Sequence, residues 1–208
     1  MTVLVIGAHG GIGRRFCEHA AEAGLSVRAM VRHPSQEEFF RQLGHEAVVG
    51  DLEGDFSHAF DGCDQVIFTA GSGPHTGPDK TLMVDLYGAI RAADLATEKG
   101  LDRFIMISAL RADAPMEAPE QLRPYMAAKY AADFHLRHAG VPWLILKPGR
   151  LTDEPGTGRV ALERDKAPDI TVSRDNVARA LLAVVQKPEL RECEIRLLDG
   201  DQPVEKAI

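Results

Sequence analysis

Val3-Leu4-Val5-Ile6-Gly7-Ala8-His9-Gly10-Gly11-Ile12-Gly13-Arg14 is the stretch that decides the fold expected for this chain. Its first four residues are all apolar, which is typical of a parallel strand buried on both faces. The glycines that follow predict a tight turn into a helix that begins near Gly11. Such a helix directs free N–H groups and the positive end of its dipole at the turn, where they favour an anion such as a pyrophosphate.

Three glycines in this turn have the spacing that a dinucleotide site requires. Gly7 can allow the tight reversal, Gly10 a close backbone approach to the pyrophosphate, and Gly13 close packing of the helix on the strand. The spacing alone also fits a glycine-rich turn without a ligand, but its place between a strand and a helix favours nucleotide binding. The residues expected to contact the nucleotide here are Gly7, His9, Gly10, Gly11, Ile12, Gly13 and Arg14.

Length and composition are those of one globular domain spanning residues 1–208, with 45% hydrophobic and 26% charged residues. The net charge of -7 argues against nucleic-acid or membrane-surface binding. No apolar run approaches the roughly 20 residues that span a bilayer, and the first strand starts too close to Met1 for a signal peptide, so a cytoplasmic location is expected. The three distant cysteines suit reduced thiols, and His135 and His138 lack a third ligand, so no metal site is expected.

The rest of the chain alternates strand and helix patterns, which predicts a Rossmann-like, doubly wound parallel sheet in three α/β/α layers. Further strands are expected over residues 25–31, 46–50, 65–70, 101–108, 143–146, 170–172 and 193–198. Helices are expected over residues 11–23, 34–43, 78–98, 120–138 and 176–186. Little sequence remains for a second domain, so a small substrate region is expected from loops near 71–79, 109–120 and 150–172.

The end of the second strand bears on the choice of cofactor. NAD sites of this kind carry an acidic residue there for the ribose 2′-hydroxyl, whereas this strand ends in Arg32. A guanidinium suits a 2′-phosphate, so NADP is favoured over NAD, with Arg14 as a second anion contact; alternatively, Arg32 is only a solvated charge. Asp51 can accept a hydrogen bond from an adenine amino group or serve as a cap or turn residue. Contacts along the same sheet edge are expected from Leu52, Ala70, Gly71 and Pro148.

Tyr125 and Lys129 form a Tyr-x-x-x-Lys pattern within the helix expected over residues 120–138. Residues four apart share a helix face, so the phenol and the ammonium can act on one substrate. A free phenol, with a pKa of about 10, is a poor acid at neutral pH, and a nearby ammonium lowers that pKa. Ser108, at the end of the fifth strand, can orient a substrate carbonyl. These three residues are candidates for a proton relay; the alternative is a surface Tyr and Lys on an amphipathic helix.

Eight segments, taken in order, carry a resemblance to a known superfamily: 5–13 (VIGAHGGIG), 31–32 (VR), 50–52 (GDL), 84–88 (VDLYG), 103–108 (RFIMIS), 125–129 (YMAAK), 147–149 (KPG) and 173–178 (SRDNVA). Together they resemble the short-chain dehydrogenase/reductase superfamily, in its compact atypical branch of sugar epimerase-like proteins and biliverdin/flavin reductases. The similarity covers nearly the whole chain. One departure is Asp85, which stands where the superfamily often has Asn in a V-N-x-x-G motif.

The resemblance implies a Rossmann-like sheet, with NADP held by the glycine turn, Arg32 and Asp51. It also implies a catalytic set in which Tyr125 acts as acid or base, Lys129 holds the nicotinamide ribose and tunes the tyrosine, and Ser108 polarises the substrate. Many compact members lack a working Tyr and Lys, whereas this chain retains the pattern. The fold by itself does not name the substrate.

These observations predict an NADP-dependent oxidoreductase or epimerase that acts on a small carbonyl, hydroxyl or sugar-like substrate. One alternative is a redox-sensing protein that binds NADP(H) without chemistry and signals to a protein partner. Another is a flavin or quinone reductase in which Tyr125 and Lys129 are dispensable. The pattern leaves open whether the protein is a monomer or a homodimer.

Overall fold

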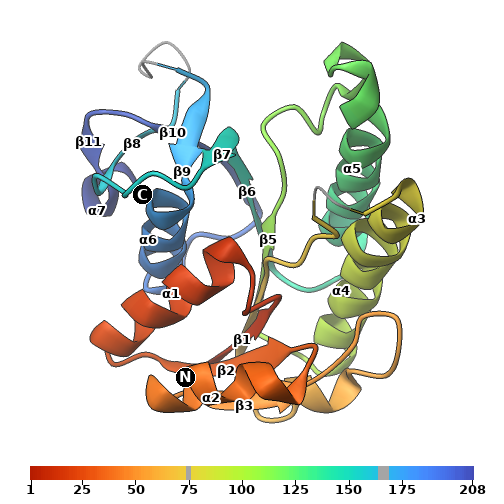
Figure 1. Ribbon diagram of the computed structural model, residues 1–208, viewed down its shortest axis with the longest axis vertical. Coiled ribbons are helices and arrows are strands. Elements are labelled where there is room, and N and C mark those ends of the chain that lie inside the picture. Colours follow the sequence, from red (N-terminus) through yellow and green to blue (C-terminus); the bar gives the residue numbers. More distant parts are fainter. Residues whose placement is uncertain (74–75, 164–168) are drawn as a thin grey trace.

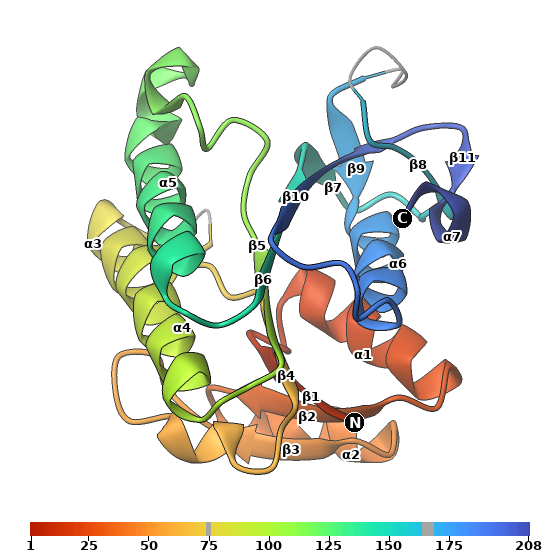
Figure 2. The same ribbon diagram turned by 180° about the vertical axis from the view of Figure 1, so that it is seen from behind.

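A mostly parallel sheet runs through the middle of the molecule, with helices on both faces (Figures 1 and 2). The computed structural model describes residues 1–73, 76–163 and 169–208. Its strands are β1 (Thr2–Ile6), β2 (Ser26–Val31), β3 (Glu46–Val49), β4 (Gln65–Phe68), β5 (Arg103–Ile107), β6 (Trp143–Pro148), β7 (Arg150–Thr152), β8 (Arg159–Ala161), β9 (Thr171–Ser173), β10 (Cys193–Asp199) and β11 (Gln202–Pro203).

The helices of the described residues include several short 3₁₀ turns and one π-helical segment. The α-helices are α1 (Gly11–Glu22), α2 (Glu37–Gln42), α3 (Pro78–Lys80), α4 (Ala89–Glu98), α5 (Arg123–His138), α6 (Arg174–Val185) and α7 (Val204–Ala207). The 3₁₀ turns are η1 (Pro34–Gln36), η2 (Ser57–Phe60), η4 (Pro115–Glu117) and η5 (Glu120–Leu122), and the π-helix is η3 (Thr81–Gly88). None of the helices among these residues is both long and apolar enough to cross a membrane.

The strand order confirms the predicted doubly wound sheet. Among the described residues, nine strands pair in the order β11-β8-β10-β6-β5-β4-β1-β2-β3. Every neighbouring pair from β10 to β3 is parallel, whereas β8 pairs antiparallel with β10 and β11. The order 3-2-1-4-5-6 is that of a Rossmann sheet, with the first strand at its centre. The carboxyl ends of β1, β4 and β5 therefore lie side by side at one edge, where this class of sheet binds ligands.

Alternate residues of β1 divide the apolar core into two layers. Val3 and Val5 belong to the cluster under α1 and α6, while Leu4 and Ile6 belong to the cluster under α4 and α5. All four are fully buried, because a parallel strand covered by helices on both faces has no solvent-facing side. Figures 1 and 2 show α1 and α6 together on one side of the sheet and α3, α4 and α5 on the other.

Two regions differ from the sequence prediction. The helix predicted over residues 78–98 consists of α3, η3 and α4, and its π-helical part turns Asp85 into the interior, where the residue is 1% exposed. The C-terminal strands β7, β8 and β11 were not predicted, because segments of two or three residues are too short to show a strand period. Parts of the loops predicted near 71–79 and 150–172, residues 74–75 and 164–168, lie outside the described residues.

Candidate functional site

The glycine turn has a backbone that other residues could not adopt without a clash. Gly7 has a φ of +84°, and a Cβ on it would lie 2.6 Å from the backbone of Ala70. A Cβ on Gly13 would lie 2.6 Å from the carbonyl oxygens of Gly7 and Ala8. The turn closes with a hydrogen bond of 2.9 Å from the Gly10 N–H to the Gly7 carbonyl. Such a turn leaves its backbone accessible to a bulky anion, so it fits the diphosphate of a dinucleotide.

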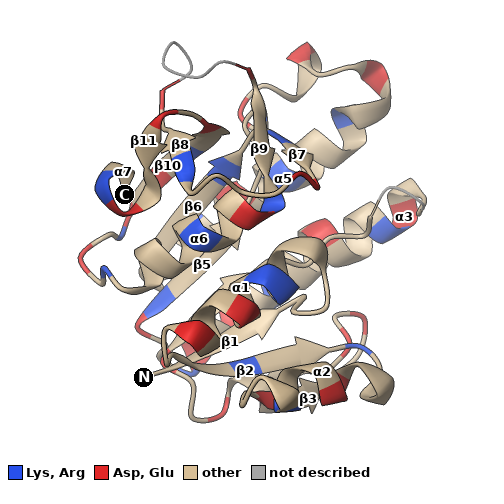
Figure 3. Cartoon of the chain, turned by 60° about the vertical axis from the view of Figure 1, so that its left-hand side comes forward, with Lys and Arg blue, Asp and Glu red and all other residues tan. Residues whose placement is uncertain are grey.

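The first turn of α1 carries basic residues where a helix normally prefers acidic ones. Gly10 makes no side-chain cap, no acidic residue lies in the first turn, and the sequence continues with Arg14 and Arg15. Figure 3 shows the basic positions of α1 in its first half and the acidic positions in its second half. Because the helix dipole places positive charge at the N-terminus, this distribution is unfavourable unless an anion binds there.

Arg32 is exposed at the end of β2, and a side chain that the sequence analysis missed braces its backbone. Gln36 Oε1 accepts hydrogen bonds of 3.1 Å from the backbone N–H groups of Arg32 and His33. The same amide contacts the glycine turn, because Gln36 Nε2 lies 3.2 Å from His9 Nδ1. Gln36 therefore joins the glycine turn to the segment after β2, and its position three residues after His33 is the signal that could have found it.

Arg14 and Asp51, two expected nucleotide contacts, each have an internal partner. The Arg14 guanidinium carbon lies 4.0 Å from the centroid of the Phe39 ring, in a cation–π contact. Asp51 is exposed, and its Oδ1 accepts a hydrogen bond of 3.0 Å from the Glu53 N–H, as in a turn. The neighbouring Leu52 is buried in the core under α4. Asp51 thus takes the turn role that the sequence left open, and its side chain is exposed.

Ala70 and Gly71 follow β4 and lie between the glycine turn and η3. Ala70 contacts Gly7, and a Cβ on Gly71 would lie 3.1 Å from Asp85 Oδ1. Asp85 Oδ2 accepts a hydrogen bond of 2.9 Å from the Ser72 N–H. The buried carboxylate of Asp85 therefore fixes the loop after β4. Pro148 is buried at the end of β6, where its carbonyl accepts a hydrogen bond of 2.9 Å from the Leu110 N–H.

Lys129 and Ser108 lie buried at the carboxyl end of β5, each about 3% exposed. The Lys129 ammonium donates a hydrogen bond of 3.0 Å to the Ile107 carbonyl and lies 3.7 Å from Asp85 Oδ1. The same Nζ is 5.9 Å from the centroid of the half-buried Tyr125 ring. The fold therefore brings the three predicted relay residues to one place, with the tyrosine nearest to solvent.

Asp133 lies in the candidate site, although the local sequence pattern does not mark it. It lies one helical turn after Lys129 on α5, is 0% exposed, and its Oδ2 accepts a hydrogen bond of 2.6 Å from Ser108 Oγ. Its other oxygen, Oδ1, has no hydrogen-bond partner among the described residues. Burial raises the pKa of Asp133 to about 6, although the Ser108 hydrogen bond and the nearby Lys147 partly oppose this change. The spacing of four from Lys129 is the sequence signal that was available.

Lys147 places a positive charge close to the Ser108–Asp133 hydrogen bond. Its Nζ lies 3.8 Å from Asp133 Oδ2, 2.6 Å from Asp113 Oδ1 and 2.7 Å from Glu194 Oε2, and its side chain is 1% exposed. Burial alone would raise the pKa of Glu194, but hydrogen bonds from Lys147 and Arg137 hold that pKa below its usual range. The Asp133 carboxyl therefore lies near two buried ammonium groups, that of Lys147 and, at longer range, that of Lys129.

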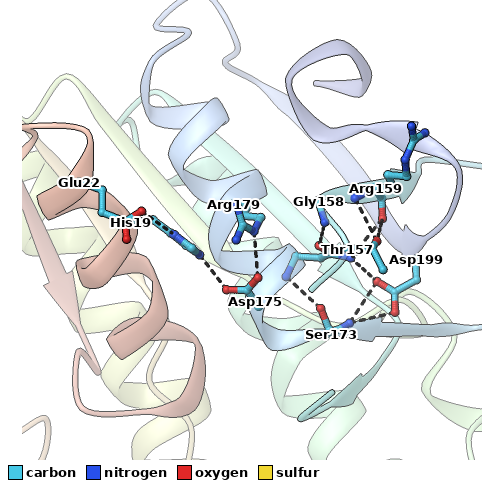
Figure 4. A network of polar contacts seen from close by, with 10 residues as sticks. His19, Glu22, Thr157, Gly158, Arg159, Ser173, Asp175, Arg179 and Asp199 are labelled. Atoms are coloured by element: carbon cyan, nitrogen blue, oxygen red, sulfur yellow. Dashed lines mark hydrogen bonds and ion pairs between the residues drawn. The ribbon is translucent and has the colours of Figure 1, made fainter. Parts of the chain in front are cut away.

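Helix α6 is tied to α1 by side chains that Figure 4 shows at close range. His19 Nε2 of α1 lies 2.7 Å from Asp175 Oδ1 of α6, and Arg179 donates a hydrogen bond of 2.9 Å to Asp175 Oδ2. Burial would raise the pKa of Asp175, but the hydrogen bonds from Arg179 and His19 hold it below the usual range. At the start of α6, Ser173 Oγ caps the helix by accepting a hydrogen bond of 3.0 Å from the Asn176 N–H. These contacts fix the first turn of α6 beside α1.

Comparisons with known proteins identify the family and the fold of this chain. A family model described as NAD(P)H-binding matches residues 7–188. An uncharacterized sugar epimerase, YhfK, from Bacillus subtilis (strain 168) is 42% identical over 212 residues, which cover 100% of this chain and 99% of that protein. A solved structure from Bacillus halodurans, described as an NAD-dependent epimerase/dehydratase, is 37% identical with a TM-score of 0.94, covering 99% of this chain and 97% of the other.

A more distant structure shares the fold alone. ChuY, an anaerobillin reductase from Escherichia coli O157:H7, is 22% identical with a TM-score of 0.78, covering 97% of this chain and 98% of that chain. The family model and the similarity to a sugar epimerase therefore confirm the resemblance to epimerase-like NAD(P)-binding proteins, and ChuY confirms the fold. From the family match and the full-length similarity, the chain belongs to the NAD(P)H-binding family.

Proposed function

We propose that this protein is an NADP(H)-dependent oxidoreductase or epimerase of the short-chain dehydrogenase/reductase type, acting on a small carbonyl, hydroxyl or sugar-like substrate. The observation that carries the proposal is the convergence of Tyr125, Lys129 and Ser108 at the end of β5, two strands from the glycine turn. In this proposal residues 1–208 form one domain, and loops near 71–79, 109–120 and 150–172 surround the substrate.

Each polar residue of the site has a role in this chemistry. When bound, the nicotinamide cofactor would supply or accept a hydride at a substrate carbon. When a carbonyl is reduced, Tyr125 gives its phenolic proton to the substrate oxygen; when an alcohol is oxidised, it takes that proton. Lys129 stabilises the phenolate that forms, and its burial beside Asp85 fixes the position of the ammonium. An epimerase would first oxidise the substrate alcohol to a carbonyl and then reduce that carbonyl from its opposite face, so that the configuration of the carbon is inverted.

The Ser108 hydroxyl offers an acceptor to the substrate. Its proton is directed to Asp133, so its lone pairs remain for a substrate hydroxyl group. To donate to a substrate carbonyl, Ser108 would first have to give up the bond to Asp133. This orientation favours a substrate that binds through a hydroxyl, as in alcohol oxidation or the first step of an epimerisation.

Replacing Tyr125 by Phe tests the proposed proton transfer. We expect the kcat of Tyr125→Phe to fall by about a hundredfold or more, since a positioned acid or base contributes on the order of 10²–10⁴. The dissociation constant for NADPH should stay within a few fold, which isothermal titration calorimetry can measure. Tyr130→Phe, one residue after Lys129 on an exposed part of α5, is the matched control.

One geometric observation favours a second candidate, a flavin or quinone reductase that does not use the tyrosine. Lys129 is hydrogen-bonded to a backbone carbonyl and paired with Asp85, so its ammonium already has partners other than Tyr125. In such an enzyme Tyr125→Phe would be nearly silent with flavin or quinone substrates. Because an epimerase consumes no net NADPH, a sensor would be indicated by a protein that binds NADPH, oxidises none of it with aldehydes, ketones, quinones or flavins, and epimerises no sugar substrate.

The preference for NADP rests on Arg32 and has its own test. Loss of a charged hydrogen bond to the 2′-phosphate in Arg32→Ala should weaken NADPH binding by about tenfold or more. NADH lacks that phosphate, so its dissociation constant should not change. Equal losses for both nucleotides would refute a role for Arg32 in cofactor choice.

A further inference from the structure

Arg174, the first residue of α6, lies across the glycine turn of α1. An ideal Cβ built on Gly11 would lie 2.8 Å from Cδ and 3.2 Å from Nε of Arg174. Gly11 does not have a positive φ, so its lack of a side chain is not required by backbone conformation. What it permits is the close approach of this arginine. A side chain from the far end of the sequence thus reaches the point where the diphosphate of a dinucleotide would bind.

Arg15 and Arg174 form ion pairs with the same carboxylate oxygen, Oδ1 of Asp153. Arg174 Nη1 lies 3.0 Å and Arg15 Nη2 lies 3.7 Å from Asp153 Oδ1. Arg15 also donates a hydrogen bond of 2.7 Å to the Gly11 carbonyl, which places its guanidinium at the same turn. The Asp153 side chain is 76% exposed, just after β7. Two guanidinium groups therefore hold one anion at the positive end of the α1 dipole, and that anion is an exposed surface carboxylate.

We propose that Arg174, together with Arg15, binds the diphosphate of the nicotinamide dinucleotide, and that Asp153 occupies the place of that anion until the nucleotide binds. This inference rests on the proposed function, since it requires a dinucleotide at the glycine turn. A guanidinium suits a phosphate because its planar set of donors can make two parallel hydrogen bonds. An exposed ion pair contributes little free energy, so a diphosphate with more charge can displace the carboxylate.

The position of α6 supports this role for Arg174. The neighbouring residue, Asp175, is held by His19 of α1, as Figure 4 shows. The start of α6 is fixed again by the Ser173 cap. The backbone of Arg174 is therefore already fixed beside α1. When Asp153 leaves, only the Arg174 side chain has to change its partner.

The diphosphate is common to NADPH and NADH, which separates this inference from the role of Arg32. We expect Arg174→Gln to raise the dissociation constants for NADPH and NADH equally, by about tenfold or more, in isothermal titration calorimetry with the full chain. Asp153→Asn should lower both dissociation constants by about two- to fivefold, because it removes the competing anion. Arg41→Gln is the matched control, because Arg41 lies in the last turn of α2 and pairs with Glu37.

Each result of this experiment supports or overturns a specific statement. If wild type binds both nucleotides and Arg174→Gln binds them no more weakly than Arg41→Gln, the inference is wrong while the proposed cofactor stands. If Asp153→Asn binds more weakly than wild type, Asp153 is not a competitor and the displacement is refuted. If wild type binds neither nucleotide, the proposed function fails as well. Because Asp153 is exposed, its variant tests the inference even if Arg174→Gln unfolds.

Discussion

Replacing Asp133 by Asn should change how the stability of the protein depends on pH. The folded-state pKa of this carboxyl is about 6, above its ordinary value of 3.8. Between these pH values the native state binds more protons than the unfolded state, so this group stabilises the fold at low pH. That contribution is lost as the pH rises through 6. At 1.36 kcal/mol per pKa unit, the difference amounts to about 3 kcal/mol.

Urea unfolding of wild type and Asp133→Asn at intervals from pH 4 to pH 8 measures this effect. The other titrating groups are common to both proteins, so the difference between the two free energies of unfolding isolates Asp133. We expect the free energy of unfolding of the variant to rise relative to that of wild type by about 2 kcal/mol between pH 4 and pH 7, since part of the full effect of about 3 kcal/mol falls below pH 4. A difference that stays flat across this range would show that Asp133 titrates normally, and the reasoning from its burial would be refuted.

Two further predictions concern the glycine turn and the end of α6. Gly7→Ala should lower the free energy of unfolding by about 2–4 kcal/mol and abolish nucleotide binding in calorimetry, because the new methyl meets the Ala70 backbone. Its control is Gly24→Ala, where φ is +67° and nothing lies within 4 Å of the Cβ, so only about 1–2 kcal/mol should be lost. Arg103→Leu should cost about 3 kcal/mol or more in urea unfolding, because this buried guanidinium donates to Gln65 and to backbone carbonyls near the end of α6; a loss below 1 kcal/mol would contradict this.

The sequence predicted those parts of the site whose constraint is local. A glycine turn can be recognised in a single chain because the spacing of its glycines is local, and Gly10 and Gly13 do pack against Gly7 and Ala8. Tyr125 and Lys129 could be chosen as candidates for the same reason, since a helix sets their spacing. The contacts of Gly7 with Ala70 and of Gly11 with Arg174, by contrast, join distant segments. The parallel sheet followed from long apolar segments separated by helix patterns, which tertiary packing did not override.

Contacts between distant segments were beyond prediction. An aspartate on a helix is normally solvent-exposed, so nothing in the local pattern marks Asp133 as buried under Ser108. Arg174 could be placed at a helix start but not over Gly11, because the packing of α6 on α1 decides that contact. The π-helical segment could not be predicted from the sequence either, since its apolar residues suit an α-helix equally well.

The outermost strand bears on how two copies of this chain could associate. β11 has only two residues, and one of them is Pro203, which carries no backbone N–H. An open sheet edge normally invites another chain to add a strand, and short strands with proline discourage such pairing. This end of the sheet is therefore protected against edge-to-edge aggregation. A homodimer, if one forms, would use a surface other than a sheet continued through β11.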